Sequence, residues 1–162
     1  MTRAEATDPE QRWTDRLHLR ALTEADVDAV AVLEHEAGIT LIPDPARARQ
    51  YVQDWASDGM GGWALEHNGQ LVGVAGLRFL TFHLRSTWDL WVCITPSGWG
   101  RGYALEAAQE ALVVAQEHSS RMPVVARTRP QATHAFDLAA RAGLVRRKDL
   151  DRDDLEVHVT HW

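Results

Sequence analysis

The chain has 162 residues, of which 45% are hydrophobic and 25% charged, a length and balance that suit one water-soluble domain with its own core. Its formal net charge of −6 argues against nucleic acid or an anionic membrane as the default partner. The single cysteine, Cys93, excludes an intramolecular disulfide, and no apolar signal core or membrane span is evident, which together suit the cytoplasm.

Alternating polar and apolar residues predict strands, and apolar residues three and four apart predict helices. Residues 1–12 show neither pattern, so we expect a loose N-terminal arm before a single domain over residues 13–162. In chain order the expected elements are a strand at 16–22, helices at 23–38 and from 44 to about 58, strands at 63–67 and 70–82 joined by a hairpin turn at Asn68-Gly69, a strand at 88–95, a helix from the glycine-rich segment to about 117, a strand at 123–128, a helix at 133–142 and a strand at 155–159. This order predicts a mixed α/β domain.

The segment "PSGWGRGYALEAAQEAL" (Pro96 to Leu112) places three glycines directly before a helix with one apolar face. A helix start leaves backbone N–H groups without partners and carries the positive end of the helix dipole. Glycines allow backbone angles that other residues avoid, and they let a bulky anion reach these amides. A strand, a glycine turn and a helix start in succession therefore predict an anion cradle, best suited to a phosphate or pyrophosphate.

Two well-known phosphate cradles do not fit this segment. The nucleotide P-loop ends in Gly-Lys-Ser/Thr, which is missing here. A dinucleotide-binding fingerprint needs a third glycine where this chain has Tyr103, and it follows the first strand of a parallel unit rather than a hairpin. A glycine-rich turn that merely caps the helix stays open as the alternative.

Residues 99–107, "WGRGYALEA", resemble the acetyl-CoA pyrophosphate loop of the GNAT acetyltransferases, and most closely that of the ribosomal-protein N-terminal acetyltransferase (RimJ/RimL-like) branch. In that branch a tryptophan commonly precedes Gly-basic-Gly-Tyr-Ala, whereas the wider superfamily has Gln or Arg in place of Trp99. "RLHLRALTEADVDAV", "GGWALEHNGQLVGVAGL" and "FDLAARAGL" resemble further segments of the branch, so the resemblance covers nearly the whole chain. It implies a mixed, mostly antiparallel central sheet of about six to seven strands, flanked by about four helices.

The activity implied by this resemblance is direct transfer of an acetyl group from acetyl-CoA to a primary amine, with no metal. The acceptor would be a small amine, an amino acid-like molecule or a protein N-terminus. Backbone amides from about Gly100 to Ala104 would hold the pyrophosphate, and the pantetheine arm would lie along the strand ending at 93–95, where neighbouring strands splay apart. The implied cofactor-binding residues are Cys93, Ile94, Thr95, Trp99, Gly100, Arg101, Gly102, Tyr103 and Ala104.

Direct transfer needs a group that removes a proton from the amine, because most amines are protonated near neutral pH. Asp89 is the candidate, since it aligns with an acidic residue of many relatives. Strand alternation also places it on the same face as Trp91 and Cys93, toward the expected thioester. An ordinary strand-end aspartate in solvent is the open alternative.

The acid that protonates the departing thiolate is harder to assign. Many relatives carry an Asn, a Ser or a Tyr at positions that are all alanine here, namely Ala132, Ala135 and Ala139. His134 is the candidate catalytic acid, with Thr133, a water or unassisted departure left open. These alanines also support a second reading, an acyl-CoA-binding GNAT-like module with little or no catalytic activity. A third reading is a structural protein that uses the glycines only as a helix cap.

Aromatic residues in the middle of the chain give the location, though not the identity, of an acceptor pocket. The connection at 81–87 commonly borders the acceptor pocket in relatives, and Arg78 or Arg85 nearby suits an acceptor carboxylate. The eight histidines are scattered without a ligand spacing, so we predict no metal site. A homodimer is common among relatives, and the sequence does not test it. The candidate acceptor residues are Phe82, His83, Trp88 and Trp91, although most such side chains belong to cores.

Overall fold

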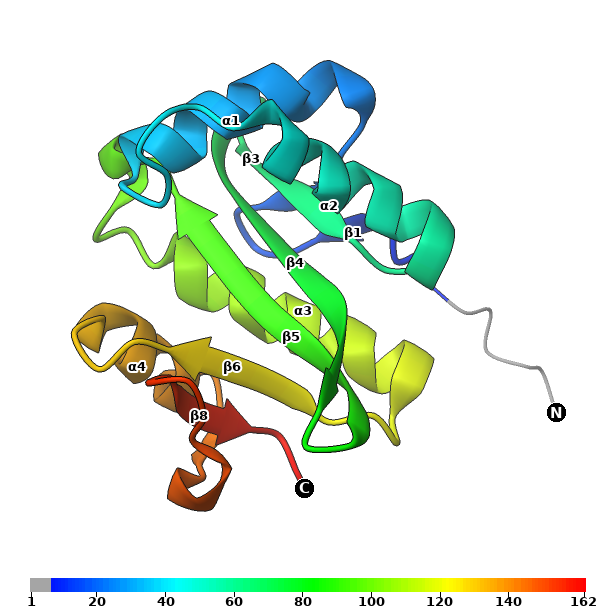
Figure 1. Cartoon of the computed structure of the whole chain (residues 1–162). Helices are drawn as coiled ribbons and strands as arrows, with labels where there is room; N and C mark the ends of the chain where they lie inside the picture. The colour runs from blue at the N-terminus through cyan, green and yellow to red at the C-terminus, as the bar shows by residue number, and fades with distance from the viewer. Residues whose placement is uncertain (1–6) are drawn as a thin grey trace, which may run out of the picture.

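The computed structural model describes residues 7–162 of the chain (Figure 1). Within these residues, eight strands form one sheet. The strands lie in the order β1-β2-β3-β4-β5-β6-β8-β7, and β5 and β6 are the parallel neighbours in a sheet that is otherwise antiparallel. Their bounds are β1 Gln11–Trp13, β2 His18–Ala21, β3 Gly62–His67, β4 Gln70–Phe82, β5 Arg85–Ile94, β6 Val124–Thr128, β7 Val145–Arg146 and β8 Glu156–Val159.

Helices cover both faces of the sheet. Helices α1 (Val27–Glu36) and α2 (Pro45–Asp58) pack on one face of the sheet. Helices α3 (Tyr103–Ser119) and α4 (Thr133–Arg141) pack on the other face. Three short 3₁₀ turns are η1 Glu24–Asp26, η2 Pro96–Gly98 and η3 Lys148–Leu150. The predicted start of α2 is confirmed, because the Asp44 side chain accepts a hydrogen bond from the Arg47 N–H (3.1 Å) and Pro45 occupies the first helical turn.

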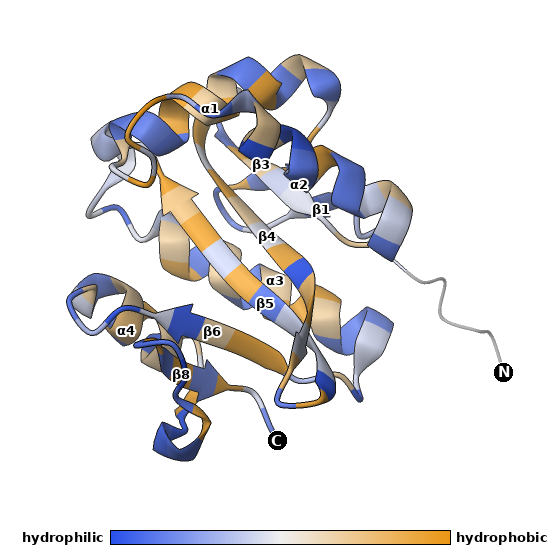
Figure 2. Cartoon of the chain, in the orientation of Figure 1, coloured by the Kyte–Doolittle hydropathy of each residue, from blue (hydrophilic) through white to orange (hydrophobic). Residues whose placement is uncertain are grey.

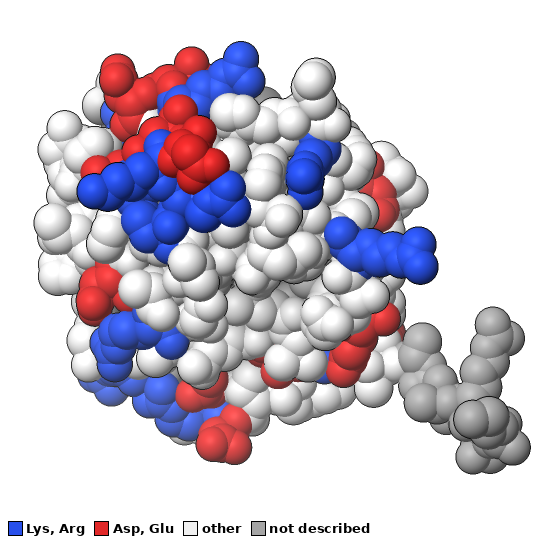
Figure 3. Space-filling model, turned by 90° about the horizontal axis from the view of Figure 1, so that it is seen from below, with Lys and Arg blue, Asp and Glu red and all other residues white. Residues whose placement is uncertain are grey.

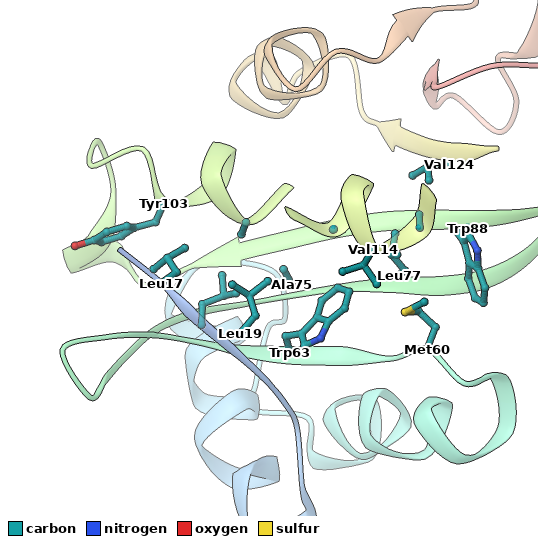
Figure 4. Close-up of a cluster of buried hydrophobic side chains, with 14 of the residues drawn as sticks. Leu17, Leu19, Met60, Trp63, Ala75, Leu77, Trp88, Tyr103, Val114 and Val124 are labelled. Atoms are coloured by element: carbon teal, nitrogen blue, oxygen red, sulfur yellow. The ribbon is translucent and has the colours of Figure 1, made fainter. Parts of the chain in front are cut away.

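The largest core cluster lies between the sheet and α3 (Figure 4). Trp63 of β3 and Val114 of α3 are fully buried there, beside Leu77, Trp88 and Met60. Figure 2 shows why the helices dock as they do, since hydrophobic residues run along β4 to β6 while each helix divides into a hydrophobic and a hydrophilic side. The core therefore fixes the start of α3 against the end of β5, where the glycine-rich segment lies.

The fold class predicted from the sequence is confirmed, although the sheet has eight strands among the described residues rather than six to seven. The additional strands are short and lie at the two edges of the sheet. One of them, β1, overlaps the predicted loose arm over 1–12 at Gln11 and Arg12, so strand pairing begins earlier than the sequence pattern indicates. Its central residue, Arg12, forms salt bridges with Glu110 (2.7 Å) and Glu117 (3.0 Å) of α3, a long-range pairing without a local signal.

A close approach of β4 to a tryptophan explains one of the strand glycines. Gly76 pairs with Trp91 of β5, and a Cβ at this glycine would lie 2.5 Å from the indole and 2.8 Å from the carbonyl oxygen of Gly61. Because Gly76 has no side chain, the Trp91 ring can stack on the Tyr51 ring of α2, with 4.1 Å between the ring centroids. A side chain at Gly76 would therefore disrupt the packing of α2 on the sheet.

We expect Gly76→Ala to destabilise the protein by about 1–3 kcal/mol, because one of the two walls that the new methyl group meets is backbone and cannot rotate away. Urea unfolding followed by circular dichroism measures the change, with Gln70→Ala on the exposed start of the same strand as the control. Equal midpoints for the two variants would contradict this account of the packing.

Candidate active site

The two parallel strands β5 and β6 pair over only two residues and then diverge (Figure 1). Trp88 pairs with Val124 and Asp89 with Val125, and no later residue of β5 pairs with β6. We call the region beyond these pairs the fork. It confirms the splaying of strands that the resemblance implied.

The fork leaves backbone groups of a central strand without a neighbouring strand. The Trp88 N–H points toward β6, because it donates to the Pro123 carbonyl (3.0 Å). Backbone groups alternate in direction along a strand, so the N–H and C=O of Val92 also point toward β6, beyond the last paired residues. Unpaired backbone donors in a half-buried position are uncommon, and they suit a ligand with amide or carbonyl groups.

The glycine-rich loop between β5 and α3 lies against a cavity that we call the first cavity. This cavity has a volume of about 630 Å³ and mostly apolar walls, and its lining residues are Ala37, Ile39, Ile94, Gly98, Trp99, Gly100, Gly102, Tyr103, Ala104, Ala132, His134 and Ala135. Gly100 and Gly102 adopt left-handed backbone angles (φ +75° and +80°) that favour glycine. No side chain caps α3, so the amides of its first turn have no partner from a capping residue.

An arginine that is distant in the sequence holds this loop. The Arg16 guanidinium donates to the Arg101 carbonyl (2.7 Å) and to the Glu106 carboxylate (2.9 Å), and it lies 4.8 Å from the centre of the Tyr103 ring. Glu106 also accepts from Thr14 and from the backbone N–H of Arg16. Burial raises the pKa of Glu106, but the hydrogen bonds from Thr14 and Arg16 outweigh it, so the net pKa is lowered and the carboxylate stays charged.

A second cavity of about 190 Å³ lies in the fork itself. It is bounded by β5, β6, α3 and α4, and its lining residues are Leu90, Trp91, Val92, Ala108, Ala126, Arg127, Thr128, Ala135, Leu138, Ala139 and Ala142. Ala135 lines both cavities, so the two adjoin. Together they form a mostly apolar channel from the glycine-rich loop into the fork.

The candidate base stands where the strands part. Both Asp89 oxygens accept hydrogen bonds from Arg127 of β6, at 3.0 Å and 2.9 Å, which joins the two strands at their last paired residue. The bonds to Asp89 raise the pKa of Arg127, so the guanidinium keeps its charge. Asp89 is thus a paired carboxylate rather than the solvated one of the alternative reading, and its role in catalysis stays a prediction.

The other predicted site residues divide into those that meet a cavity and those that do not. His134, in the first turn of α4, lines the first cavity. Six of the nine predicted cofactor-binding residues line the same cavity from other segments, namely Ile94, Trp99, Gly100, Gly102, Tyr103 and Ala104. Cys93, Thr95 and Arg101 line neither of the two cavities. For Arg101 the contribution to the loop is its carbonyl, held by Arg16.

The four predicted acceptor residues are not brought together. Trp91 lines the second cavity, whereas Trp88 is buried in the core under α3. Phe82 packs in a separate cluster at the far end of the sheet, and the His83 ring contacts the carbonyl of Leu150 (3.0 Å). Phe82, His83 and Trp88 line neither cavity, so the aromatic pattern along the sequence reflects mainly core packing.

Cys93 lies on the α1 and α2 face beside a buried carboxylate. Glu34 is 2% exposed, and one of its oxygens accepts hydrogen bonds from the Tyr51 hydroxyl (3.0 Å) and from Arg47 (3.2 Å). Burial first, and then the charge of Glu34, raises the pKa of the Cys93 thiol to about 12. A thiol in this state is a poor nucleophile.

Comparison with solved structures places the fold among acetyltransferases. The chain is similar to the crystal structure of an acetyltransferase from Agrobacterium tumefaciens str. C58, with a TM-score of 0.80, 23% identity and 94% of each chain covered. It is also similar to RimL, a ribosomal L7/L12 alpha-N-protein acetyltransferase in complex with coenzyme A (TM-score 0.69, 14% identity, 90% of this chain and 94% of that chain). A third neighbour is the microcin C7 self-immunity acetyltransferase MccE in complex with acetyl-CoA and AMP (TM-score 0.70, 12% identity, 90% and 92% covered).

The model of the acetyltransferase (GNAT) domain family matches residues 16–145, and the chain belongs to this family. The match begins at Arg16, and it includes the fork, both cavities and the glycine-rich loop. The family inferred from residues 99–107 is confirmed. Among the described residues, no helix combines the length and apolar character needed to cross a membrane, and no group of three or more metal-ligating side chains gathers.

We expect Cys93 to react with iodoacetamide at about pH 8 at least about tenfold more slowly in the native protein than in urea, because burial keeps the thiol protonated. The pKa of the Cys93 thiol is raised from the ordinary value of 9.0 to about 12 in the folded protein. Between pH 9 and pH 12 the folded state therefore binds more protons than the unfolded state, and the free energy of unfolding falls as pH rises through this range. Fast native labelling would contradict the buried position.

Proposed function

We propose that this protein is an acetyl-CoA-dependent N-acetyltransferase that transfers an acetyl group directly to a primary amine. The observation that carries the proposal is the channel that begins at an uncapped helix start and ends in the fork. A diphosphate fits the uncapped start of α3, and a thioester-bearing arm fits the fork.

The donor would bind with its diphosphate on the amides of the first turn of α3. Gly102 precedes this turn without a side-chain cap, and its neighbour Arg101 has its carbonyl turned to Arg16 and away from an incoming anion. The pantetheine arm would lie in the fork, where the free backbone groups of Val92 can pair with its amides as a neighbouring strand would. The apolar walls of both cavities suit the methyl groups and methylenes of the arm.

In the reaction, the nitrogen of a neutral amine attacks the thioester carbonyl carbon, the C–S bond breaks, and the electron pair stays on sulfur. Asp89 is the proposed acceptor of the amine proton, directly or through a water, because it stands where β5 and β6 part. His134, at the rim of the first cavity, is the proposed source of a proton for the released thiolate. We place the reaction in the cytoplasm.

The acceptor would be a small amine, an amino acid-like molecule or a protein N-terminus. Beside Asp89, Arg78 of the paired strand is exposed enough to meet an acceptor carboxylate. The solved neighbours include enzymes named for a ribosomal protein and for spermidine, which are acceptors of different chemical classes. The acceptor class is therefore assigned only as a primary amine.

A second candidate function, an acyl-CoA-binding module, rests on the alanines of α4. Ala132 and Ala135 line the first cavity, and Ala135 and Ala139 line the second, so α4 brings no hydroxyl or amide from these positions. Measurable CoA binding without thiol release over a broad panel of amines and short peptides would favour the module over the enzyme.

We expect calorimetric titration to show CoA binding, and Arg16→Met to weaken it about tenfold, since a misplaced loop loses about one charge-assisted hydrogen bond to the diphosphate. Arg147→Met is the matched control, because Arg147 pairs with Asp149 on the surface outside the site. Pantetheine, which has no diphosphate, should bind equally well to the wild type and to Arg16→Met by ligand-observed NMR. Wild-type protein that does not bind CoA would refute the proposed function.

We expect Asp89→Asn to lower kcat for thiol release by about a hundredfold or more, as removal of a general base does. Arg127→Met is the matched variant, since it breaks the same ion pair but keeps the carboxylate. Retained turnover in Arg127→Met with lost turnover in Asp89→Asn supports Asp89 as the base. Equal losses in the two variants would instead mean that the pair only holds the fork together.

A further inference from the structure

The second cavity has almost no polar side chain on the side that faces α4. Trp91 and Arg127 line it as well, but their polar ends lie on the other face of the sheet, where the Trp91 ring stacks on Tyr51 and Arg127 binds Asp89. Thr128, the last residue of β6, carries the single hydroxyl among the lining residues. The remaining lining side chains are aliphatic: Leu90, Val92, Ala108, Ala126, Ala135, Leu138, Ala139 and Ala142.

The Thr128 hydroxyl has no hydrogen-bond partner among the described residues. Thr128 is 8% exposed, and its Oγ1 is fully buried. Strand alternation places it on the same face as Ala126, which packs against Ala139 of α4. Because α4 presents alanines here, it offers no side-chain acceptor or donor. A buried hydroxyl without a partner destabilises the ligand-free protein, which favours a role in binding a ligand.

We propose that the Thr128 hydroxyl donates a hydrogen bond to the sulfur of the acyl-CoA thioester and strengthens that bond as the thiolate departs. The inference rests on the proposed function, and it adds the leaving-group contact that Ala132, Ala135 and Ala139 cannot supply. The hydroxyl and the free backbone groups of Val92 line the same cavity from opposite arms of the fork. A thioester in the fork therefore meets a donor on each side.

The chemistry at this position is stabilisation of charge without net proton transfer from threonine. The amine nitrogen forms the C–N bond, the C–S bond breaks, and sulfur keeps the electron pair while the amine proton passes to Asp89 or water. The Thr128 proton stays on its oxygen and points at the sulfur, which is later protonated by solvent or by His134. A hydrogen bond to a charged acceptor is stronger than one to a neutral acceptor, so the contact favours the transition state over the bound thioester.

The test compares Thr128→Val with Thr128→Ser, which retains a hydroxyl, and with Thr87→Val as a matched control. Thr87 is a fully buried threonine of β5, but its hydroxyl donates to the Leu80 carbonyl (2.8 Å) and it lines neither cavity. Thr87→Val should therefore lower the melting temperature without affecting the site. Thr128→Val should leave the melting temperature of the ligand-free protein unchanged or higher, because it removes an orphan polar group.

The decisive readout is the thiol pKa of CoA bound to each variant, followed by ultraviolet absorbance of the thiolate, which needs no acceptor. Thr128→Val should raise this pKa by about one to two units relative to the wild type, whereas Thr128→Ser and Thr87→Val should not. With an acceptor found by the thiol-release screen, kcat should fall about tenfold in Thr128→Val while the Kd for CoA changes less than about threefold.

An unshifted thiol pKa in Thr128→Val overturns the inference and leaves the proposed function intact, provided that CoA still binds. Weaker CoA binding with an unshifted thiol pKa also overturns it, since the hydroxyl would then contact an amide of the pantetheine arm. Wild-type protein that fails to bind CoA overturns the proposed function and this inference together.

Discussion

The parting of β5 and β6 after two residue pairs is the feature on which the rest of the site depends. In a continuous sheet the backbone of β5 would be satisfied on both edges, and no space would remain between β5 and β6. Here the N–H and C=O of Val92 face a cavity instead, and the small side chains of α4 leave that cavity open. A sheet that gives up backbone hydrogen bonds at its centre loses stability, which makes a bound ligand the natural partner for those groups.

Arginine–carboxylate pairs between distant segments hold this open arrangement in place. Arg127 and Asp89 join the two strands at the base of the fork, and Arg16 joins the glycine-rich loop to α3 through Glu106. The carboxylates of Asp89 and Glu106 are each 18% exposed, against 62% for Asp149, so these pairs contribute more than the pair of Arg147 with Asp149. On the face shown in Figure 3, positive and negative side chains lie beside one another, so the charge on that face serves pairing rather than a field of one sign.

Local sequence signals predicted the elements that local chemistry determines. The hairpin at Asn68-Gly69 and the strand from Gln70 to Phe82 have the predicted bounds, because turn residues and alternation specify them. The edge strands β1 and β7 were missed, since three-residue and two-residue strands carry no readable period and depend on pairing with β2 and β8. The glycine-rich loop was recognised for a similar reason, because the anion contact proposed for it uses the loop's own backbone.

The parts of the site that the sequence did not reveal are all long-range. Nothing in "TDRL" indicates that Arg16 reaches a carbonyl 85 residues away, and Asp89 gives no sign that it is paired with Arg127. The aromatic residues in the middle of the chain do not gather at one place, because strand alternation sends neighbouring aromatics to opposite faces, as with Trp88 under α3 and Trp91 over α2.

Several unsatisfied or left-handed groups of the described chain lie along the two adjoining cavities. Gly100 and Gly102 adopt left-handed backbone angles in the loop, and the first amides of α3 have no side-chain cap. Val92 and the unpartnered Thr128 hydroxyl line the cavity in the fork. Each of these features costs stability in the free protein, and each is the kind of group that a long ligand with a diphosphate, amides and a sulfur would satisfy in that order. A protein that only needed a stable helix cap would have no reason to leave donors unpaired beyond the loop, and this separates the ligand-binding account from the purely structural one.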